Sequence, residues 1–463
     1  MFHSTRSNKL VAPSEAIVNG LASDGGLYVI DELPKVNYKD LIDLDYPSLA
    51  SKIISLFFDD LAYEDIYNEV KEAYKSFDID SVVEVKSFDD ICFLELFHGP
   101  TLAFKDLALV VLPRLMKLAK KKLKIESKTT ILTATSGDTG GAALNGFKDV
   151  EGINIIVLYP DGGVSPVQEA QMHSFKGKNS FVYAVDGNFD DCQNFVKRFF
   201  EENTDLNLSS ANSINIARLV PQIVYYFYTY IKLLNDGIIK EDEVIDFTVP
   251  TGNFGNILAG FYAKNMGLPI GNLVCASNQN DVLTEFFNSG VYNKNREFFK
   301  TNSPSMDILI SSNLERWLYY ACGNDVLKCR SLINELNTKG MYEFNNPYSY
   351  FKAHSCSEEN TLKVIKEVYE KYGYLIDPHT AVAYDAAVKF KQRHMVVVST
   401  ASPFKFPGSV LKAFNVESES LIDLSVKFNL EIPKQINYPV FLKEVISKEE
   451  ASVLIRGVIQ CLK

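Results

Sequence analysis

A single lysine stands in an unusual context in the segment FHGPTLAFKD, residues 97 to 106. A turn of small residues is followed by an apolar step and then by Lys105. Burial penalises an ammonium group, so a lysine in this setting either extends its amine to solvent or keeps the amine for chemistry. The segment alone leaves both interpretations open, and the rest of the chain has to decide between them.

A phosphate could bind at the segment VPTGNFGNILAG, residues 249 to 260. The pattern predicts a strand that ends at Pro250, a glycine-bearing loop and a helix that begins near Asn256. Backbone N–H groups and the positive end of the helix dipole then converge on one point. The segment has neither the G-x-G-x-x-G dinucleotide motif nor the G-K-[ST] ending of a P-loop, so an ordinary strand-to-helix turn is an equally good interpretation.

A second turn of the same kind is predicted in TATSGDTGGAA, residues 133 to 143. Its Thr, Ser and Asp side chains are good helix N-caps, and its amide groups could hold a carboxylate or a phosphate. Taken alone, simple capping explains this turn better. Together with Lys105 and the hydroxyl-rich strand end VVVSTASPFKF, the two turns supply what a pyridoxal-phosphate enzyme needs. These needs are an amine for the aldehyde, a phosphate site, a carboxylate site and a partner for the ring nitrogen.

Metal and disulfide chemistry are not expected from the sequence. The seven Cys are scattered, odd in number and never spaced as C-x-x-C, and the six His show no H-E-x-x-H or other metal-ligand spacing. We interpret the cysteines as reduced, mostly structural thiols.

The elements that must position these residues alternate along the chain from about residue 80. Short β-rich apolar runs such as TTILTAT, INIIVLYP, VIDFTVP and HMVVVSTA alternate with longer amphipathic segments, which predicts βαβ units and parallel sheets flanked by helices, an α/β fold. Residues 1–80 show helical segments and few strand signals, and we assign them to a separate N-terminal domain. We place a catalytic region at 81–420, with a smaller subdomain at about 120–215. Residues 421–463 are expected to pack back on that region.

Composition limits the possible partners and the cellular location. The 463 residues exceed one usual core, and 46% hydrophobic with 23% charged residues is typical of a fully folded chain. A formal net charge of -11 argues against nucleic acid or an anionic membrane as the main partner. No stretch is apolar enough for a transmembrane helix and the N-terminus lacks a signal-peptide core, so we expect a cytoplasmic protein. The lysine run at 117–128 is interpreted as a solvated helix end.

The motifs occur in an order that identifies a family. The opening segments STRS and EAIVNGLASDGGLYV are followed by LFHGPTLAFKD, TATSGDTGGAA, NSINIARLVPQIVYYF, PTGNFGN, SPSMDILISSNLER, DPHTAVA and TASPFKF. Over nearly its full length the chain thus resembles the threonine synthases, pyridoxal-phosphate enzymes of fold type II, the tryptophan-synthase-β-like group. The long N-terminal segment favours this family over the shorter dehydratases and cysteine synthases that share the fold.

The resemblance implies roles for individual residues. It makes Lys105 the lysine that forms a Schiff base with pyridoxal 5'-phosphate, and it gives Thr400 a neutral hydroxyl contact with the pyridine nitrogen. The cofactor phosphate would be held by Gly252, Asn253, Phe254 and Asn256. The loop around the substrate carboxylate and nearby cofactor atoms would comprise Thr135, Ser136, Asp138 and Thr139.

The resemblance also implies a reaction, in which O-phospho-L-homoserine and water become L-threonine and phosphate. Lys105 would move protons between neighbouring carbons, since one base on a flexible stem suits several such transfers. The departing phosphate needs cations, and Arg218 is our first choice because a guanidinium fork matches phosphate. Ser213, Asn215 and Lys405 are further candidates for that task. A structural ion pair remains the alternative for Arg218 and Lys405.

Other conspicuous residues have simpler interpretations. His98 could line the site or be a hydrogen-bonded structural residue, and His379, near a predicted helix start, is interpreted as structural. The segment SPSMDILISSNLERW could border the pocket or only pack. The aromatic run at 225–231 predicts a buried helix.

Three other functions stay open on the sequence alone. A fold-type-II serine or threonine dehydratase would need no cations for a leaving phosphate. A non-catalytic relative could bind pyridoxal phosphate or a phosphorylated metabolite, and an α/β phosphosugar enzyme without a cofactor would leave Lys105 unexplained. The expected partner is the small-molecule substrate, in a monomer or a homodimer.

Overall fold

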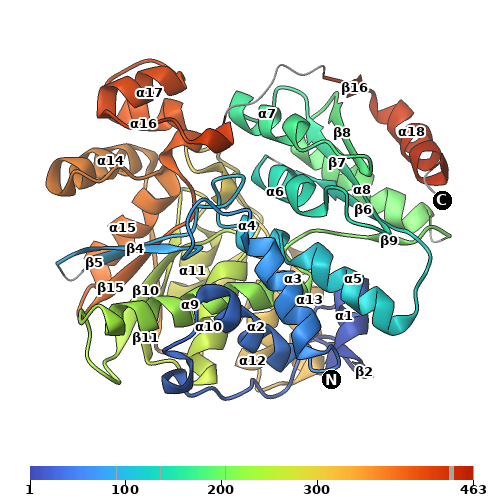
Figure 1. The fold of residues 1–463 in the computed structure, drawn as a ribbon, viewed down its shortest axis with the longest axis horizontal. Coiled ribbons are helices and arrows are strands. Elements are labelled where there is room, and N and C mark those ends of the chain that lie inside the picture. The colour runs from blue at the N-terminus through green and yellow to red at the C-terminus, as the bar shows by residue number, and fades with distance from the viewer. Residues whose placement is uncertain (90, 136, 204, 437–442, 462–463) are drawn as a thin grey trace.

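Six strands form the larger of two parallel sheets in the computed structural model, which describes residues 1–89, 91–135, 137–203, 205–436 and 443–461 (Figure 1). The order across this sheet is β14, β11, β10, β15, β5 and β4, and only β4 with β5 is antiparallel. The strands are β4 (Glu84–Phe88), β5 (Ile91–Glu95), β10 (Ile245–Pro250), β11 (Ile270–Ser277), β14 (Phe351–Ser355) and β15 (Met395–Ser399). The predicted α/β class is confirmed.

Helices cover both faces of the larger sheet. One face carries α9 (Ile216–Asn235) and α10 (Gly255–Met266), and the other carries α14 (Glu358–Tyr372), α15 (Pro378–Phe390) and α16 (Pro407–Ala413). Along β5, Cys92 and Leu94 belong to the core cluster of α9 and α10. Ile91 and Phe93 alternate with them and belong to the cluster of α14 and α15. A strand buried on both faces is apolar along its length, as β5 is from Ile91 to Leu94.

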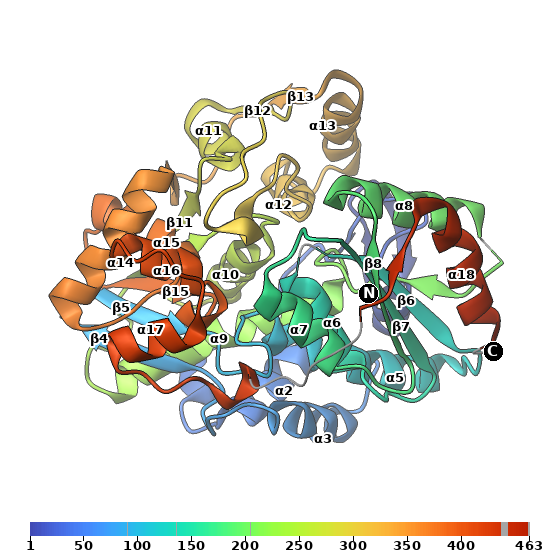
Figure 2. The ribbon, with the colours of Figure 1, turned by 90° about the horizontal axis from the view of Figure 1, so that it is seen from above.

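The middle of the chain forms the second parallel sheet, in the order β16, β8, β7, β6 and β9. The strands are β6 (Thr129–Ala134), β7 (Ile153–Pro160), β8 (Ser180–Val185), β9 (Leu208–Ser209) and β16 (Val445–Ile446). Its helices are α5 (Leu112–Leu123), α6 (Asp138–Phe147), α7 (Pro166–Ser174) and α8 (Phe189–Glu202). Seen from above, the two sheets lie side by side, and α6 and α7 occupy the side that faces the larger sheet (Figure 2).

The first 80 residues contain a small antiparallel sheet as well as helices. The elements are β1 (Phe2–Ser4), β2 (Ser7–Val11), α1 (Pro13–Asn19), β3 (Tyr28–Val29), α2 (Tyr46–Phe57) and α3 (Tyr63–Tyr74). The helices were predicted, but β1 and β3, with three and two residues, are too short for an alternating pattern, and the five residues of β2 are mostly exposed and do not alternate. Phe2 and Ile53 share one buried cluster with residues of α9 and α10. The domain boundaries given above stay predictions.

The C-terminal segment returns to the smaller sheet. After α17 (Leu421–Phe428), strand β16 pairs with β8, and α18 (Lys448–Cys461) packs Ile455 and Ile459 into the cluster that contains Leu132 of β6. The end of the chain therefore covers both an edge and a face of this sheet (Figure 1).

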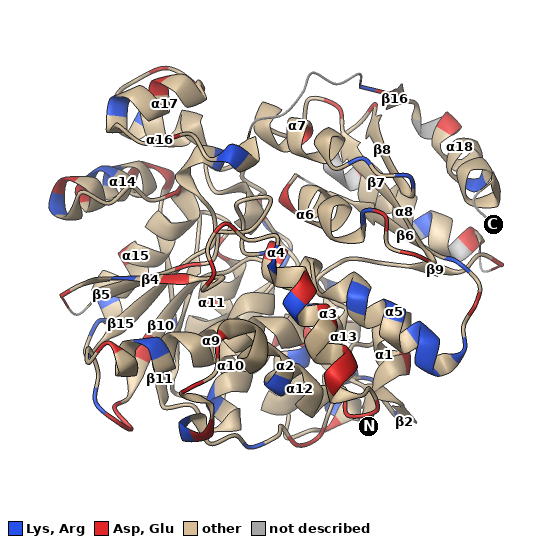
Figure 3. Ribbon diagram, viewed as in Figure 1, with Lys and Arg blue, Asp and Glu red and all other residues tan. Residues whose placement is uncertain are grey.

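The lysine run closes α5, whose last turn carries Lys120, Lys121 and Lys122 and is coloured blue in Figure 3. Lys121 and Lys122 are exposed, as the predicted helix end requires. Lys120 differs, because its ammonium is buried and donates to Ser127 O, Thr129 Oγ1 and Gly152 O at 2.8, 3.0 and 2.8 Å. Among the described residues, none of the helices is long and apolar enough to span a bilayer.

The remaining elements are distributed along the chain. They are α4 (Asp106–Leu109), α11 (Val282–Ser289), β12 (Val291–Asn293), α12 (Leu314–Ala321), α13 (Val326–Lys339), β13 (Met341–Glu343) and the short 3-10 helices η1 (Tyr38–Leu41), η2 (Pro304–Met306), η3 (Pro403–Lys405) and η4 (Lys434–Ile436). Strands β12 and β13 pair with each other.

Candidate active site

Three loops meet at one edge of the larger sheet. Strands β10, β15 and β5 are adjacent and parallel, so the segments that follow Pro250, Ser399 and Glu95 leave the sheet on the same side. Crevices at the carboxyl ends of parallel strands are where α/β proteins bind ligands. The glycine-bearing turn, Thr400 and the segment that carries Lys105 are therefore brought together, although they are far apart in sequence.

Backbone hydrogen bonds fix the segment that carries Lys105. Phe104 N donates to Thr400 O at 2.8 Å, and Ser402 N donates to Leu102 O at 3.0 Å. Leu102 has a left-handed φ of 57°, a conformation that costs a branched residue energy and is concentrated at functional sites. The Lys105 side chain, which is 15% exposed, therefore extends from a backbone that these hydrogen bonds hold in place.

The surroundings of Lys105 favour its neutral amine. Burial lowers the pKa of Lys105 to about 8, Asp138 opposes this shift, and the charges of Arg218 and Lys405 add to it. Only a neutral amine attacks a carbonyl carbon, so these neighbours make the side chain reactive close to neutral pH.

Lys405 and Asp138 form a buried ion pair next to Lys105. Lys405 Nζ lies 2.7 Å from Asp138 Oδ1 and also donates to Thr101 O at 2.8 Å and Gln171 Oε1 at 3.1 Å. These contacts use the three N–H donors of the ammonium. Although burial alone would raise it, Lys405 and Lys105 hold the pKa of Asp138 well below its ordinary value. The pair therefore favours the ionised form of the carboxylate at neutral pH.

Asp106 shapes the turn that precedes Lys105. Its carboxylate accepts Thr101 N and Thr101 Oγ1, both at 2.7 Å, and burial raises its pKa to about 6 although these bonds oppose the shift. A Cβ on Gly99 would lie 2.5 Å from Asp106 Oδ2, so the turn requires glycine there. Sequence analysis did not single out Asp106 beyond its place in the motif.

The glycine-bearing turn has the form of a phosphate site. Phe254 precedes α10 with a left-handed φ of 64°, and the first amide groups of a helix have no partner within it. A Cβ on Gly252 would approach Ser305 O to 2.8 Å. Asn256 Oδ1 accepts from Tyr225 and Tyr226, while its buried Nδ2 lacks a hydrogen-bond partner within the described structure. An orphaned amide donor beside free helix amides fits the phosphate of pyridoxal phosphate.

Other parts of the fit are consistent with the same cofactor. Asn253 O is held by Asn313 N at 3.1 Å and by Asn313 Nδ2 at 3.0 Å, which fixes the loop. Thr400 is buried where β15 ends, in the loop that touches the backbone of Phe104. Its hydroxyl is a neutral group of the kind predicted for the ring nitrogen.

The turn at 135–139 uses most of its polar groups internally. Thr135 Oγ1 accepts from Gly137 N at 3.0 Å and from Gly140 N at 2.9 Å, which is helix capping. Asp138 is engaged as described, and Thr139 is half-buried. Ser136, predicted to belong to this loop, lies outside the described residues.

The segment from Ser213 to Arg218 brings a cation to the site. Arg218 is buried, lowers the pKa of Lys105, and has its own pKa lowered by burial to about 10. Its Nη1 donates to Ala211 O at 2.7 Å, while its buried Nε has no partner within the described residues. Ser213 Oγ lies 3.3 Å from Ser312 Oγ. Asn215 caps α9 and donates to Ile17 O, which ties this segment to the N-terminal region.

The two singled-out histidines are both held by carboxylates. His98 lies 2.9 Å from Glu95 and 3.1 Å from Asp78, and these carboxylates raise its pKa although burial opposes them. His379 stands in the first turn of α15, as predicted for a helix start, and contacts Asp377 at 2.7 Å.

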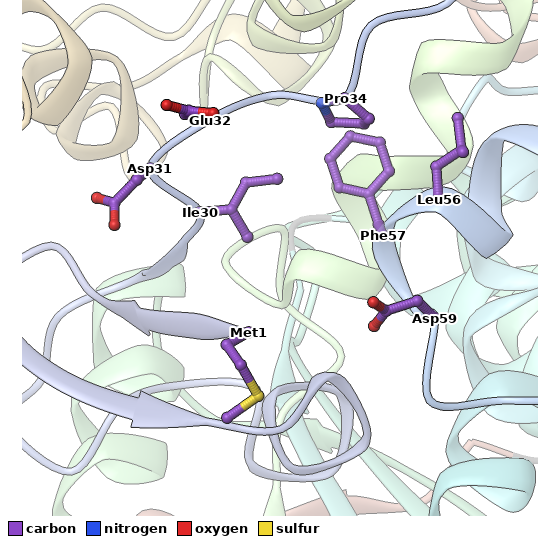
Figure 4. Close-up of a pocket in the computed structure, with 8 residues that line it drawn as sticks. All are labelled: Met1, Ile30, Asp31, Glu32, Pro34, Leu56, Phe57 and Asp59. Carbon is purple, nitrogen blue, oxygen red and sulfur yellow. The ribbon is translucent and has the colours of Figure 1, made fainter.

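A surface hollow of about 450 Å³ lies elsewhere, over the N-terminal region. Its walls come from the loop after β3 and the end of α2 (Figure 4). They consist of Met1, Ile30, Asp31, Glu32, Pro34, Leu56, Phe57 and Asp59. None of the predicted site residues lines this hollow, so the chemistry is assigned to the sheet edge.

Comparisons with known proteins identify the family of this chain. The family described as pyridoxal-phosphate dependent enzyme matches residues 86–400, and the families of the threonine synthase N terminus and C-terminal region match 1–74 and 380–438. Threonine synthase of Saccharomyces cerevisiae is 36% identical to this chain, and the alignment covers 90% of this chain and 89% of the yeast protein. Threonine synthase of Pseudomonas aeruginosa is 39% identical, and the alignment covers 86% of this chain and 87% of the Pseudomonas protein. A solved pyridoxal-phosphate-bound threonine synthase from Brucella melitensis has a TM-score of 0.90 at 38% identity and covers 99% of both chains.

Proposed function

Because the chain belongs to the threonine synthase family of pyridoxal-phosphate-dependent lyases, we propose that its site converts O-phospho-L-homoserine and water into L-threonine and phosphate. The single observation that carries the assignment of the site is the meeting of Lys105, Thr400 and the 252–256 turn on three adjacent strands. Such a meeting supplies amine, ring partner and phosphate site to one cofactor.

Bound pyridoxal phosphate supplies an electron sink at the carbon next to the amino group. We propose that Gly252, Asn253, Phe254 and Asn256 hold its phosphate and that Thr400 meets its ring nitrogen. A neutral hydroxyl leaves this nitrogen less protonated than a carboxylate would, so the pyridine ring withdraws electrons less strongly.

Lys105 is the proposed acid and base of the reaction. The amine moves one proton at a time: protons leave Cα and Cβ and phosphate leaves Cγ, a proton returns to Cγ, water adds its hydroxyl to Cβ, and a proton returns to Cα. The remaining proton of water is released with the phosphate. The pKa of about 8 lets the same amine accept and donate protons near neutral pH. A flexible stem lets one group reach neighbouring carbons.

Arg218 is the proposed cation for the departing phosphate. It is buried beside Lys105, its Nε is unpartnered within the described residues, and a guanidinium pairs with phosphate through two parallel bonds. Ser213, Asn215 and Lys405 stay predictions for this task, and the occupied donors of Lys405 favour Arg218 over it. Thr135, Ser136, Asp138 and Thr139 stay predictions for the substrate-carboxylate loop.

None of the seven cysteines, all of which the structure describes, forms a disulfide, which supports the proposal of a cytoplasmic enzyme. All residues invoked for the site come from one chain, so a monomer or a homodimer would carry complete sites.

The test is a paired assay of phosphate and threonine release from O-phospho-L-homoserine by the wild-type chain and Lys105→Ala. We expect equal amounts of both products from the wild type and no turnover from the variant. A yellow, cofactor-loaded wild type that releases neither product would contradict the proposal. Formation of a keto acid and ammonia from serine or threonine would then identify a dehydratase.

A further inference from the structure

Ser305 joins three parts of the site that are distant in sequence. It lies in η2, its Oγ donates to Asp138 Oδ2 at 2.9 Å, and its backbone N donates to His379 Nε2 at 3.2 Å. Its carbonyl oxygen lies 2.8 Å from where a Cβ on Gly252 would stand. The residue thus touches the phosphate turn, the start of α15 and the carboxylate beside Lys105.

The two oxygens of Asp138 have different partners. Oδ1 is held by Lys405 Nζ at 2.7 Å and by Gln168 Nε2 at 3.0 Å. Oδ2 accepts the Ser305 hydroxyl and lies 3.9 Å from Lys105 Nζ, beyond hydrogen-bond distance. Since Oδ1 is fixed from two sides, the carboxylate cannot turn away, and the hydroxyl sits on the oxygen that faces Lys105.

His379 fixes the position of η2. Because its Nε2 faces a backbone N–H and accepts, the ring proton is on Nδ1, which donates to Asp377 Oδ2 at 2.7 Å. Asp377 is fully buried and also accepts from the backbone N of His379 and of Thr380. The first turn of α15 therefore anchors Ser305, which explains why the segments SPSMDILISSNLERW and DPHTAVA lie together.

We propose that Ser305 is a positioning residue: its hydroxyl occupies Asp138 Oδ2 and so keeps the Lys105 amine out of a closed ion pair with that carboxylate. The inference rests on the proposed role of Lys105. Without the hydroxyl, Oδ2 regains its full attraction for a cation, and Lys105 is the cation within reach. The other charged groups that face Lys105, which are Asp106, Arg218 and Lys405, stay in place. The amine then holds its proton more tightly and reacts more slowly.

The test measures the reactivity of the Lys105 amine without turnover. Full-length chain prepared without cofactor is treated with formaldehyde and a borane reductant, and methylation of Lys105 is followed by peptide mass spectrometry from pH 6.5 to 10. The variants are Ser305→Ala, Ser305→Thr, which retains a hydroxyl, and Ser409→Ala, which removes a part-buried serine hydroxyl bonded to Asn302. Thermal midpoints check that all variants are folded.

We expect the rate for Ser305→Ala at pH 7 to fall about tenfold, because one pKa unit changes the neutral fraction tenfold. Ser305→Thr and Ser409→Ala are expected to stay within about twofold of the wild type. An unchanged pH profile for Ser305→Ala, or a loss in Ser305→Thr as large as in Ser305→Ala, would overturn the proposal. Labelling needs no substrate, so a shifted profile in a chain that does not turn over O-phospho-L-homoserine would refute the proposed function alone.

Discussion

The two strand-to-helix turns at 251–256 and 135–139 look alike in sequence and differ in what their polar groups do. The first leaves Asn256 Nδ2 buried without a partner among the described residues and requires Gly252 for a close approach. In the second turn, Thr135 caps the helix and Asp138 forms an ion pair with Lys405. One turn is open to an anion, and the other already contains one.

This difference shows that residue type and spacing identify a strand-to-helix turn but do not show whether its polar groups are already paired. Polar groups that saturate one another stabilise the fold, whereas groups left unsaturated in a buried place are available to a ligand. The two turns should therefore respond to substitution in opposite ways, one through stability and the other through cofactor affinity.

The largest effect is expected from breaking the pair in the saturated turn. Lys405→Met removes the nearest counter-ion of the buried Asp138 carboxylate, which should lower the free energy of unfolding by about 3–5 kcal/mol in urea titrations of the cofactor-free chain. The double variant Lys405→Met with Asp138→Asn should regain part of this loss, because neither charge is left alone. Normal stability with a raised KM for the phosphorylated substrate would instead make Lys405 a substrate ligand.

The open turn is tested by Asn256→Asp. This change keeps the oxygen to which Tyr225 and Tyr226 donate and replaces the orphaned donor with an oxygen that repels phosphate. We expect the Kd for pyridoxal phosphate, followed by absorbance, to rise about 100-fold, the value of one strong charge-assisted hydrogen bond. An unchanged Kd would show that this turn does not hold the cofactor.

The pH dependence of pyridoxal phosphate binding tests the lowered pKa of Lys105. With a Lys105 pKa of about 8, the neutral fraction and the rate of association should rise about tenfold from pH 7 to pH 9. The depressed pKa also means that the unfolded chain binds more protons, so the Lys105 contribution to stability should increase as pH rises from 8 toward 10.5. A rate independent of pH across this interval would argue against Lys105 as the reacting amine.

The smallest effect is expected from Thr135→Val, which is nearly isosteric and removes the hydroxyl that caps two amides. The free energy of unfolding should fall by about 1 kcal/mol, typical of a lost helix cap. The Kd for pyridoxal phosphate should change less than threefold. If the free energy of cofactor binding changed more than the free energy of unfolding, Thr135 would contribute to cofactor binding as the turn at 251–256 does.

The sequence predicted the α/β class, the strands before both turns and the helix start at Pro378, because these depend on local periodicity and on proline. It did not reveal which polar groups are already paired. The bond between Ser305 and Asp138 and the burial of Lys120 depend on segments that only the folded chain brings together. The three-stranded N-terminal sheet escaped notice because β1 and β3 are shorter than the run of about four residues in which alternation can be read, and β2 is mostly exposed and does not alternate.

The order of strands in the larger sheet bears on how the protein is made. Strand β15 lies between β10 and β5, yet it is synthesised about 300 residues after β5, a separation that slows folding because a long loop must close first. A nascent chain that ends before Met395 lacks the strand that joins the two halves of this sheet and lacks Thr400. We therefore expect that the chain captures its cofactor only after β15 and Thr400 have been synthesised.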